Sequence, residues 1–298
     1  NSLAKLAEMI GNPVKYPVFE NNADGALLPI SGISPYDSPI SRLEDFRSNK
    51  AMASFFVNTL VELNDPRLPI FMDEATKNDG SQEKIGYKGY PSGFAATERF
   101  DYNASNINAT LGTAPMKVLF MTYAEVEFIK AEMAWRGLIT DQAAPHYRKA
   151  VEAIIEQWGG VVPGDYFDNP KATYDGTLER ILLQKHLAAF FCDYQAWFEY
   201  RRTGLPEMKP GAGMDNNKMV PVRFNYPATI STPKSGGKNN IAQLHQNIEK
   251  TADLPEVLDK SAVYSIGQTN DTVPDPFFYL KKSNSRYFGK GQISSSTS

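Results

Sequence analysis

Apolar side chains recur at intervals of three and four residues between positions 122 and 202 of the chain. This spacing places them on one face of an α-helix. It predicts one helix over 122–136, a second over about 140–158 and a third from Thr177 to about Arg202. Glycine lies at or just beyond the end of each segment, where it commonly terminates a helix. The centre of the chain is therefore predicted to be helical.

The helix over 122–136 has a recognisable start. Thr122 can cap the first turn, and Glu125 three residues later completes a capping box. Arg136 and Gly137 close the segment. The apolar face predicted for this helix consists of Val126, Ile129, Met133 and Trp135.

The second helix carries a repeat signature. Ala143, Tyr147 and Ala150 follow the pattern of the second helix of a tetratricopeptide repeat. The small residues allow two helices to approach closely, and the aromatic ring fills the groove between them. Because one helix pair cannot bury its own apolar face, neighbouring helices are expected beside it. The fold is therefore predicted to be mainly α, with tetratricopeptide-like helix pairs.

The end of the third helix, within "YQAWFEYRRTGLPEM", is explained by helix structure alone. Trp197 is interpreted as a core anchor, and Arg201 and Arg202 occupy the last turn, where cations oppose the negative end of the helix dipole. Gly204 is a natural stop, and Pro206 prevents continuation. Trp197, Arg201, Arg202 and Gly204 are therefore interpreted as structural residues.

The remaining chain is less regular. Residues 1–12 resemble the end of a helix, and Ser48 or Asn49 is expected to open another that ends at residues 64–66. The apolar face of this helix is predicted to consist of Met52, Phe55, Phe56, Leu60 and Leu63. The segments expected to be long loops or irregular structure are 13–45 and 66–118; a short strand at 219–224, a weakly amphipathic helix at 239–250 and a flexible tail at 283–298 complete the prediction.

Charge and composition exclude several classes of protein. The 298-residue chain has a formal net charge of −3 and no basic run longer than a pair, which argues against binding to nucleic acid. Its one cysteine, Cys192, rules out an internal disulfide and a cysteine-rich metal site. No apolar run is long enough to span a membrane. No signal peptide is recognised and the first residue is not Met, so a processed or partial chain is expected.

No catalytic or metal-binding motif is found. The three histidines lie far apart, and the glycine-rich and nucleophile motifs of nucleotide-binding proteins and hydrolases are missing from the sequence. Two carboxylate pairs, Glu125 with Glu127 and Asp73 with Glu74, leave a glycoside hydrolase as an alternative, because that chemistry needs only two carboxylates brought together. Glu125 is better explained as a cap. No catalytic residue and no metal ligand are assigned.

A cluster of aromatic residues in the second long loop is the strongest indication of a binding site. Sugar rings present apolar C–H faces beside hydroxyl groups, so a binder combines flat aromatic faces with amides and hydroxyls. The alternative is that these rings fasten the long loops to the helical body. The residues predicted to bind ligand are Tyr87, Tyr90, Phe94, Phe100, Tyr102 and Asn103.

Several stretches resemble a known family. "ERILLQKHLAAFFCDYQAWFEYRRTGLPEM" followed by "VPVRFNYP" is similar to the SusD/RagB-like family of Bacteroidetes outer-membrane lipoproteins, and most similar to its second SusD-like group. "FFVNTLVELNDPRLPIF", "GYPSGF", "MTYAEVEFIKAEMAWRGL" and "YRKAVEAIIEQWG" continue the resemblance in the expected order. The resemblance covers residues 1–228.

The resemblance implies a SusD-like α/α superhelix with loop-rich insertions and no enzymatic activity. Family members are lipid-anchored at the surface of the outer membrane, where they capture oligosaccharides, or in some cases peptides, for a SusC-type TonB-dependent transporter. They are longer, beginning with a signal peptide, a lipidated cysteine and further helices. Residues 1–298 are therefore predicted to be a single SusD-like domain that lacks the N-terminal part. No cofactor is expected, although a structural calcium ion is left open, as are a peptide ligand and a pure protein-docking role.

Overall fold

The computed structural model describes residues 2–38, 40–42, 47–48, 50–214, 218, 220–221 and 278–280. The chain divides into two compact units. One consists of Asn1–Ser92, Thr97–Met208 and Asp275–Lys282, and the other of Gly93–Ala96, Lys209–Pro274 and Ser283–Ser298. The fold described below is that of the first unit. The predicted strand at 219–224 (apart from 220–221), the helix at 239–250 and the tail at 283–298 lie outside the described residues.

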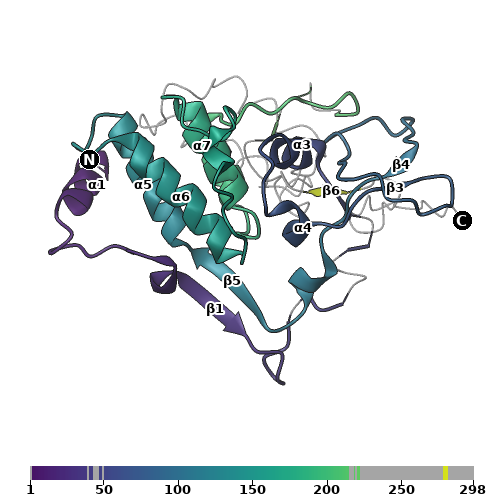
Figure 1. The fold of residues 1–298 in the computed structure, drawn as a ribbon, viewed down its shortest axis with the longest axis horizontal. Helices are drawn as coiled ribbons and strands as arrows, with labels where there is room; N and C mark the ends of the chain where they lie inside the picture. The colour runs from purple at the N-terminus through teal and green to yellow at the C-terminus, as the bar shows by residue number, and fades with distance from the viewer. Residues whose placement is uncertain are drawn as a thin grey trace, which may run out of the picture. The chain divides into compact units, whose positions relative to one another are not determined.

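The centre of the first unit is a pair of long helices, as the sequence predicts. Helix α5 (Tyr123–Trp135) and helix α6 (Ala143–Gln157) lie alongside each other, with helix α7 (Leu178–Ala188) next to them (Figure 1). Tyr147 and Ala150 are buried in α6, and the Tyr147 hydroxyl donates a 2.6 Å hydrogen bond to the Ala172 carbonyl. The prediction of a mainly α fold built on tetratricopeptide-like helix pairs is confirmed.

The helix ends form as their sequences indicate. The Thr122 hydroxyl accepts a 3.2 Å hydrogen bond from the Glu125 amide at the start of α5. Gly159 adopts a φ of +78° after α6, and the Gly159 and Gly160 amides donate back to the Glu156 and Ile155 carbonyls. This pattern is a Schellman motif, which satisfies carbonyls that a helix end otherwise leaves open. It fixes the position of Trp158, the residue between α6 and Gly159.

The buried face of α5 differs from the prediction. Trp135 is 43% exposed and donates from its indole nitrogen to the Gly176 carbonyl, whereas Glu127 and Glu132 are buried. A buried carboxylate is tolerated when it is paired and hydrogen-bonded. Glu127 pairs with Lys130 and His146, and Glu132 accepts from Arg136 and Arg202. Apolar periodicity misses such positions because the side chains are charged.

The prediction of one continuous third helix is wrong. Residues 177–202 form two helices, α7 and α8 (Gln195–Thr203), separated by a turn. Phe191 and Asp193 adopt positive φ values of +64° and +51° in that turn, a conformation that an α-helix does not contain.

Among the residues that the structure describes, the rest of the first unit combines short helices with three two-stranded antiparallel sheets. The helices are α1 (Ser2–Gly11), η1 (Asn22–Asp24), α3 (Ser54–Glu62), α4 (Leu68–Phe71), η2 (Ala109–Gly112) and, after α6, η3 (Tyr166–Asp168). The strand pairs are β1 (Ala26–Ile30) with β5 (Met116–Met121), β2 (Lys50–Met52) with β6 (Phe278–Leu280), and β3 (Thr76–Lys77) with β4 (Tyr102–Asn103). None of the described helices is long and apolar enough to cross a membrane.

Two expectations for the N-terminal half are corrected by these elements. The segment 13–45, expected to be a loop, contains strand β1, whose partner β5 lies some ninety residues later in the chain. The helix expected to begin at Ser48 or Asn49 begins at Ser54, and Met52 belongs to strand β2 instead. Both errors have one cause, since strand pairing between distant segments leaves no periodic pattern in a short strand.

The core is aromatic where α3, α4, α6 and α7 meet. The Phe71 ring centroid lies 4.2 Å from that of Phe190 and 5.1 Å from that of Trp158, and the Phe56 and Phe190 rings stack at 5.2 Å. Beside this cluster lies a buried ion pair. Asp65 accepts from the Arg67 guanidinium and from the Tyr166 hydroxyl, and neither charged side chain of the pair is exposed. The pair connects the end of α3 to η3.

We expect the stability of the α5–α6 pair to depend on pH through His146. Its Nδ1 atom lies 2.6 Å from a Glu127 oxygen and its Nε2 atom 3.2 Å from an Asp141 oxygen, so both carboxylates raise its pKa above the usual value. A raised pKa stabilises the folded state fully below the unfolded value of about 6.5. That contribution is lost as pH rises through the folded pKa.

The measurement is the free energy of unfolding in urea at a series of pH values from about 5.5 upward, which spans the unfolded pKa of histidine. The wild-type protein should lose stability with rising pH, and the His146→Gln variant should show a shallower loss. Equal slopes for the two proteins would show that folding does not change the pKa of His146.

Candidate functional site

The structure brings three of the predicted binding residues together. The ring centroids of Tyr90, Phe100 and Tyr102 lie 4.6 to 5.6 Å from one another. Tyr87 lies apart from this cluster and packs against the core. Asn103 lies in β4, and Phe94, which belongs to the second unit, is buried.

Part of the aromatic cluster holds the loop in place. The Tyr90 hydroxyl donates to the Tyr102 carbonyl, and the Tyr102 hydroxyl donates to the Gly89 carbonyl, each at 3.0 Å. A Cβ atom on Gly89 would lie 2.5 Å from the Ser54 nitrogen, so glycine is required for this close approach to α3. The Asn103 amide donates to Thr76 and Lys77 across the β3–β4 pair. The polar groups of Tyr90 and Asn103 are thus bonded within the loop region, and whether either residue also contacts a ligand stays a prediction.

The other rings remain partly accessible. Tyr87, Phe100 and Tyr102 are half-buried, and the Lys88 ammonium lies 5.3 Å from the Tyr102 ring centroid. Burial, with a smaller contribution from Glu74, raises the pKa of Tyr87, so its hydroxyl stays protonated. We use the name loop surface for Lys88, Phe100 and Tyr102, which lie together, and for Tyr87, which lies apart from them on the same loop. It offers ring carbons, hydroxyl groups and one cation, and its role in binding stays a prediction.

The residues around the end of α8 are buried or paired with neighbouring side chains. Trp197 is 3% exposed, and the Arg201 guanidinium lies 4.9 Å from its ring centroid. Arg202 donates two hydrogen bonds, of 2.8 and 2.6 Å, to the carboxylate of Glu132 on α5. Burial alone would raise the pKa of Glu132, but this arginine holds it below its usual value. Gly204 ends α8 with a φ of +74°.

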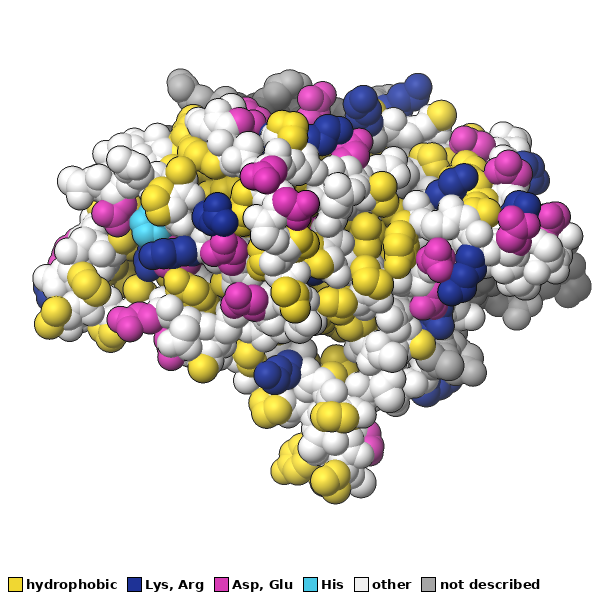
Figure 2. Space-filling model, in the orientation of Figure 1, with side chains coloured by type: hydrophobic (Ala, Val, Ile, Leu, Met, Phe, Trp, Pro, Cys, Tyr) yellow, Lys and Arg dark blue, Asp and Glu magenta, His cyan; other side chains and the backbone are white. Residues whose placement is uncertain are grey.

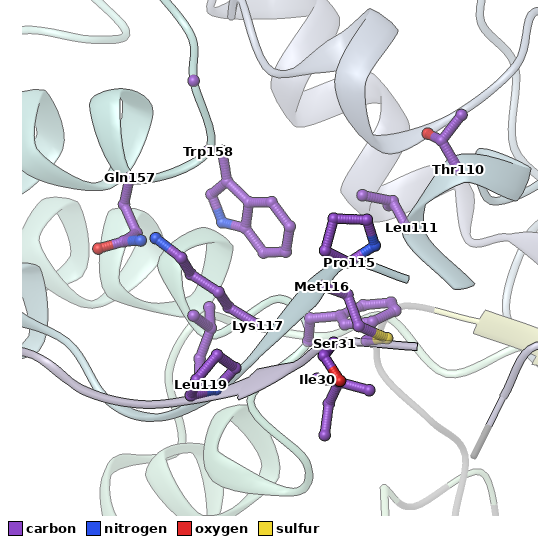
Figure 3. Close-up of a pocket in the computed structure, with 13 residues that line it drawn as sticks. Ile30, Ser31, Thr110, Leu111, Pro115, Met116, Lys117, Leu119, Gln157 and Trp158 are labelled. Carbon is purple, nitrogen blue, oxygen red and sulfur yellow. The ribbon is translucent and has the colours of Figure 1, made fainter. Parts of the chain in front are cut away.

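A pocket that the sequence did not indicate lies between the β1–β5 strand pair and the end of α6 (Figure 3). Its volume is about 510 Å³, within the range of about 300–1,000 Å³ typical of small-molecule sites. Four separate stretches of the chain, 29–31, 110–119, 157–159 and residue 191, contribute to it, which is why no local motif revealed it. The lining residues are Pro29, Ile30, Ser31, Thr110, Leu111, Pro115, Met116, Lys117, Leu119, Gln157, Trp158, Gly159 and Phe191.

The pocket has apolar walls and one polar corner. In Figure 3, the Lys117 ammonium and the Gln157 amide point toward each other beside the indole nitrogen of Trp158. The Trp158 nitrogen and the Gln157 amide oxygen are buried without a hydrogen-bond partner. Most buried polar atoms in proteins have a partner. This corner is therefore the part of the pocket with unused hydrogen-bonding capacity.

The carboxylates weighed for an enzyme have other partners. Asp73 pairs with Arg47, Glu74 with Lys84, and Glu127 with Lys130 and His146. Among the described residues, no group of three or more His, Cys, Asp or Glu side chains is placed to hold a metal ion.

Surface charge is mixed. Figure 2 shows cationic and anionic side chains interspersed on the visible face, with apolar ones gathered at the tip of the β1–β5 strand pair. Ile33 and Tyr36 at this tip are 72% and 69% exposed. No basic patch suited to nucleic acid is visible on that face.

Fold and surfaces together define a helical-repeat protein of the tetratricopeptide type, with loops that extend from the helix pairs. The sequence model of the second SusD-like family, described as "Starch-binding associating with outer membrane", matches residues 1–227. The chain belongs to this SusD-like family.

Solved structures share the fold. SusD homologues from Bacteroides thetaiotaomicron and Bacteroides uniformis match with TM-scores of 0.65 and 0.61 and identities of 23% and 22%, over 83% and 85% of this chain and 57% and 58% of theirs. A chitin-binding SusD homologue from Flavobacterium johnsoniae matches with a TM-score of 0.57 and 21% identity, over 81% of this chain and 58% of its own. The chain thus spans about three fifths of these proteins. A search of curated proteins found no match.

Proposed function

We propose that this chain captures oligosaccharides at the surface of the bacterial outer membrane, for uptake through a SusC-type TonB-dependent transporter. The observation that carries the proposal is the match of residues 1–227 to a family described as starch-binding and associated with the outer membrane. Structural neighbours named as chitin-binding support a glycan ligand. The chain would bind without catalysis and without a cofactor, and the whole protein would be held by an N-terminal lipid anchor.

The loop surface is the proposed contact with the glycan. Half-buried rings keep a fixed orientation and still expose carbon to a sugar face, which suits stacking. The Lys88 ammonium and the Tyr87 hydroxyl can donate hydrogen bonds to sugar oxygens. The Tyr102 hydroxyl donates to the Gly89 carbonyl and can therefore only accept from the sugar. Tyr90 and Asn103 would support this surface from below, because their polar groups already bond to the backbone or to Thr76.

Tyr87→Ala should weaken glycan binding by about 1–3 kcal/mol, the usual cost of removing a binding hot spot. Isothermal titration calorimetry with the bound oligosaccharide measures this change. Tyr36→Ala is the matched control, because Tyr36 is an exposed tyrosine at the tip of another element and should leave affinity unchanged. If both variants bind like the wild type, Tyr87 does not contact the glycan. Tyr90→Ala is expected to lower stability instead, because the side chain is buried.

The function itself is tested by calorimetry against plant, fungal and host oligosaccharides, with a reducing-end assay on the same mixtures. Saturable binding without new reducing ends is the expected result. New reducing ends would indicate a glycoside hydrolase. Binding of peptides and of no glycan would shift the ligand class to peptides on the same scaffold.

A further inference from the structure

We propose that the pocket between the β1–β5 strand pair and the end of α6 binds a carboxylate carried on a compact apolar body. The pocket shares no residue with the loop surface, so this proposal does not depend on the glycan function. The chemistry is shared by small aromatic or branched acids and by the C-terminal residue of a short peptide.

The apolar half of the pocket is a rigid aromatic wall. The Trp158 and Phe191 rings meet at 90° with centroids 6.1 Å apart, and Trp158 also packs at 85° against Phe71. The Schellman motif at Gly159 fixes Trp158. Phe191 reaches the wall from a left-handed backbone conformation, with φ at +64°. Such a conformation is uncommon for an aromatic residue, and strained backbone is concentrated at functional sites.

The other walls are largely carbon. Leu111, Pro115 and Met116 line the side opposite Trp158 (Figure 3). Ser31 and Thr110 supply two hydroxyl side chains to the pocket lining, so a neutral sugar would find few hydrogen-bond partners on these walls. An aromatic or branched aliphatic body matches these walls better.

The polar corner of the pocket favours a ligand that carries a negatively charged group. Within the described part of the chain, no ion pair is found for Lys117, an exposed residue of β5, and its ammonium faces the Gln157 amide in Figure 3. The Gln157 amide nitrogen can donate to an anion, whereas the unpaired Gln157 oxygen is an acceptor and adds nothing to anion binding. The buried indole N–H of Trp158 also lacks an acceptor. Hydrogen bonds between ionised partners are shorter and stronger than neutral ones. A carboxylate therefore gains most at this corner.

The end of α6 does not oppose an anion as strongly as an open helix end would. The carbonyl end of a helix carries partial negative charge on its unbonded oxygens. Here the carbonyls of Ile154, Ile155 and Glu156 accept hydrogen bonds from the amides of residues 158–160. The partial charge facing the pocket is reduced accordingly.

The test compares acids with matched neutral amides. The probes are N-acetyl-phenylalanine, N-acetyl-phenylalaninamide, 3-phenylpropionate and glucuronate, titrated into the full chain and followed by calorimetry and by the indole N–H signals in NMR spectra. An apolar acid should bind at least about tenfold more tightly than the amide, as expected for one charge-assisted hydrogen bond. Glucuronate should bind more weakly than the apolar acids, and the indole signal that is absent in Trp158→Phe should shift.

Variants at Lys117 separate charge from packing. Lys117→Met should abolish the preference for the acid over the amide, whereas Lys117→Arg should keep it. Lys149→Met is the control, because Lys149 is an exposed lysine on α6 and does not line the pocket. Lys117→Met should leave glycan binding unchanged, so this proposal and the glycan function can fail separately.

Each outcome has one meaning. Tighter binding of N-acetyl-phenylalanine than of 3-phenylpropionate identifies a peptide C-terminus as the source, and the reverse order identifies a free acid. No acid binding, equal binding of acid and amide by the wild type, or an unchanged preference in Lys117→Met would each overturn the proposal.

Discussion

Asp65→Ala is expected to lower the free energy of unfolding by about 3–5 kcal/mol, the usual cost of breaking a buried ion pair by removing one partner. The carboxylate accepts from the Arg67 side chain at 2.8 and 2.7 Å and from the Tyr166 hydroxyl at 2.8 Å. Burial alone would raise the pKa of Asp65, but the charge of Arg67 lowers it. The alanine variant leaves a fully buried guanidinium without its counter-charge. Urea denaturation of both proteins measures the loss.

An exposed pair provides the control for this prediction. Glu62 and Lys171 lie 2.7 Å apart at the surface, with side chains 54% and 57% exposed, and Glu62→Ala should cost no more than about 1 kcal/mol. The double variant Asp65→Leu with Arg67→Met should recover much of the stability, since apolar residues of similar volume often replace a buried pair without loss. A small effect of Asp65→Ala would mean that the pair is not what holds α3 to η3.

Trp197→Ala should destabilise the protein by about 3–5 kcal/mol, as large-to-small substitutions of buried aromatic residues do. The indole is almost fully buried and packs against the Tyr194 and Phe198 rings at 6.1 and 5.7 Å. Thermal and urea unfolding measure the effect. Phe198→Ala changes the next residue, which is 42% exposed, and should have a much smaller effect. A Trp197→Ala protein of normal stability that no longer binds glycan would make Trp197 a ligand residue.

The helices in the centre of the chain could be predicted because residues close together in the sequence determine where each helix begins, packs and ends. Thr122, Tyr147 and Gly159 act within one or two helical turns of their own positions, so spacing alone indicates a cap, a packed groove and a stop. The break between α7 and α8 was missed because Phe191 and Asp193, which are neither glycine nor asparagine, adopt positive φ values. Composition gave no sign of that turn.

The candidate sites were harder to predict because they depend on distant contacts. The aromatic loop was visible as a cluster in the sequence, yet only the structure separates buried Tyr90 from half-buried Tyr87 and Phe100. The pocket requires Lys117 on β5 to lie near Trp158 at the end of α6, and the position of β5 depends on its pairing with β1. Such pairing is decided by tertiary packing, which overrides local preference.

The buried acids of α5 have a consequence for how the helices align. Glu127 is neutralised from α6 by His146, and Glu132 from α8 by Arg202. A slip of either neighbour by one helical turn, about 5.4 Å, would remove one of the two cations that each carboxylate pairs with, and only Lys130 or Arg136 of α5 itself would remain. Apolar faces alone would tolerate such a slip, because small and aromatic residues recur along each helix. The two acids therefore favour one alignment of α5 with α6 and α8 over the alignments shifted by a turn.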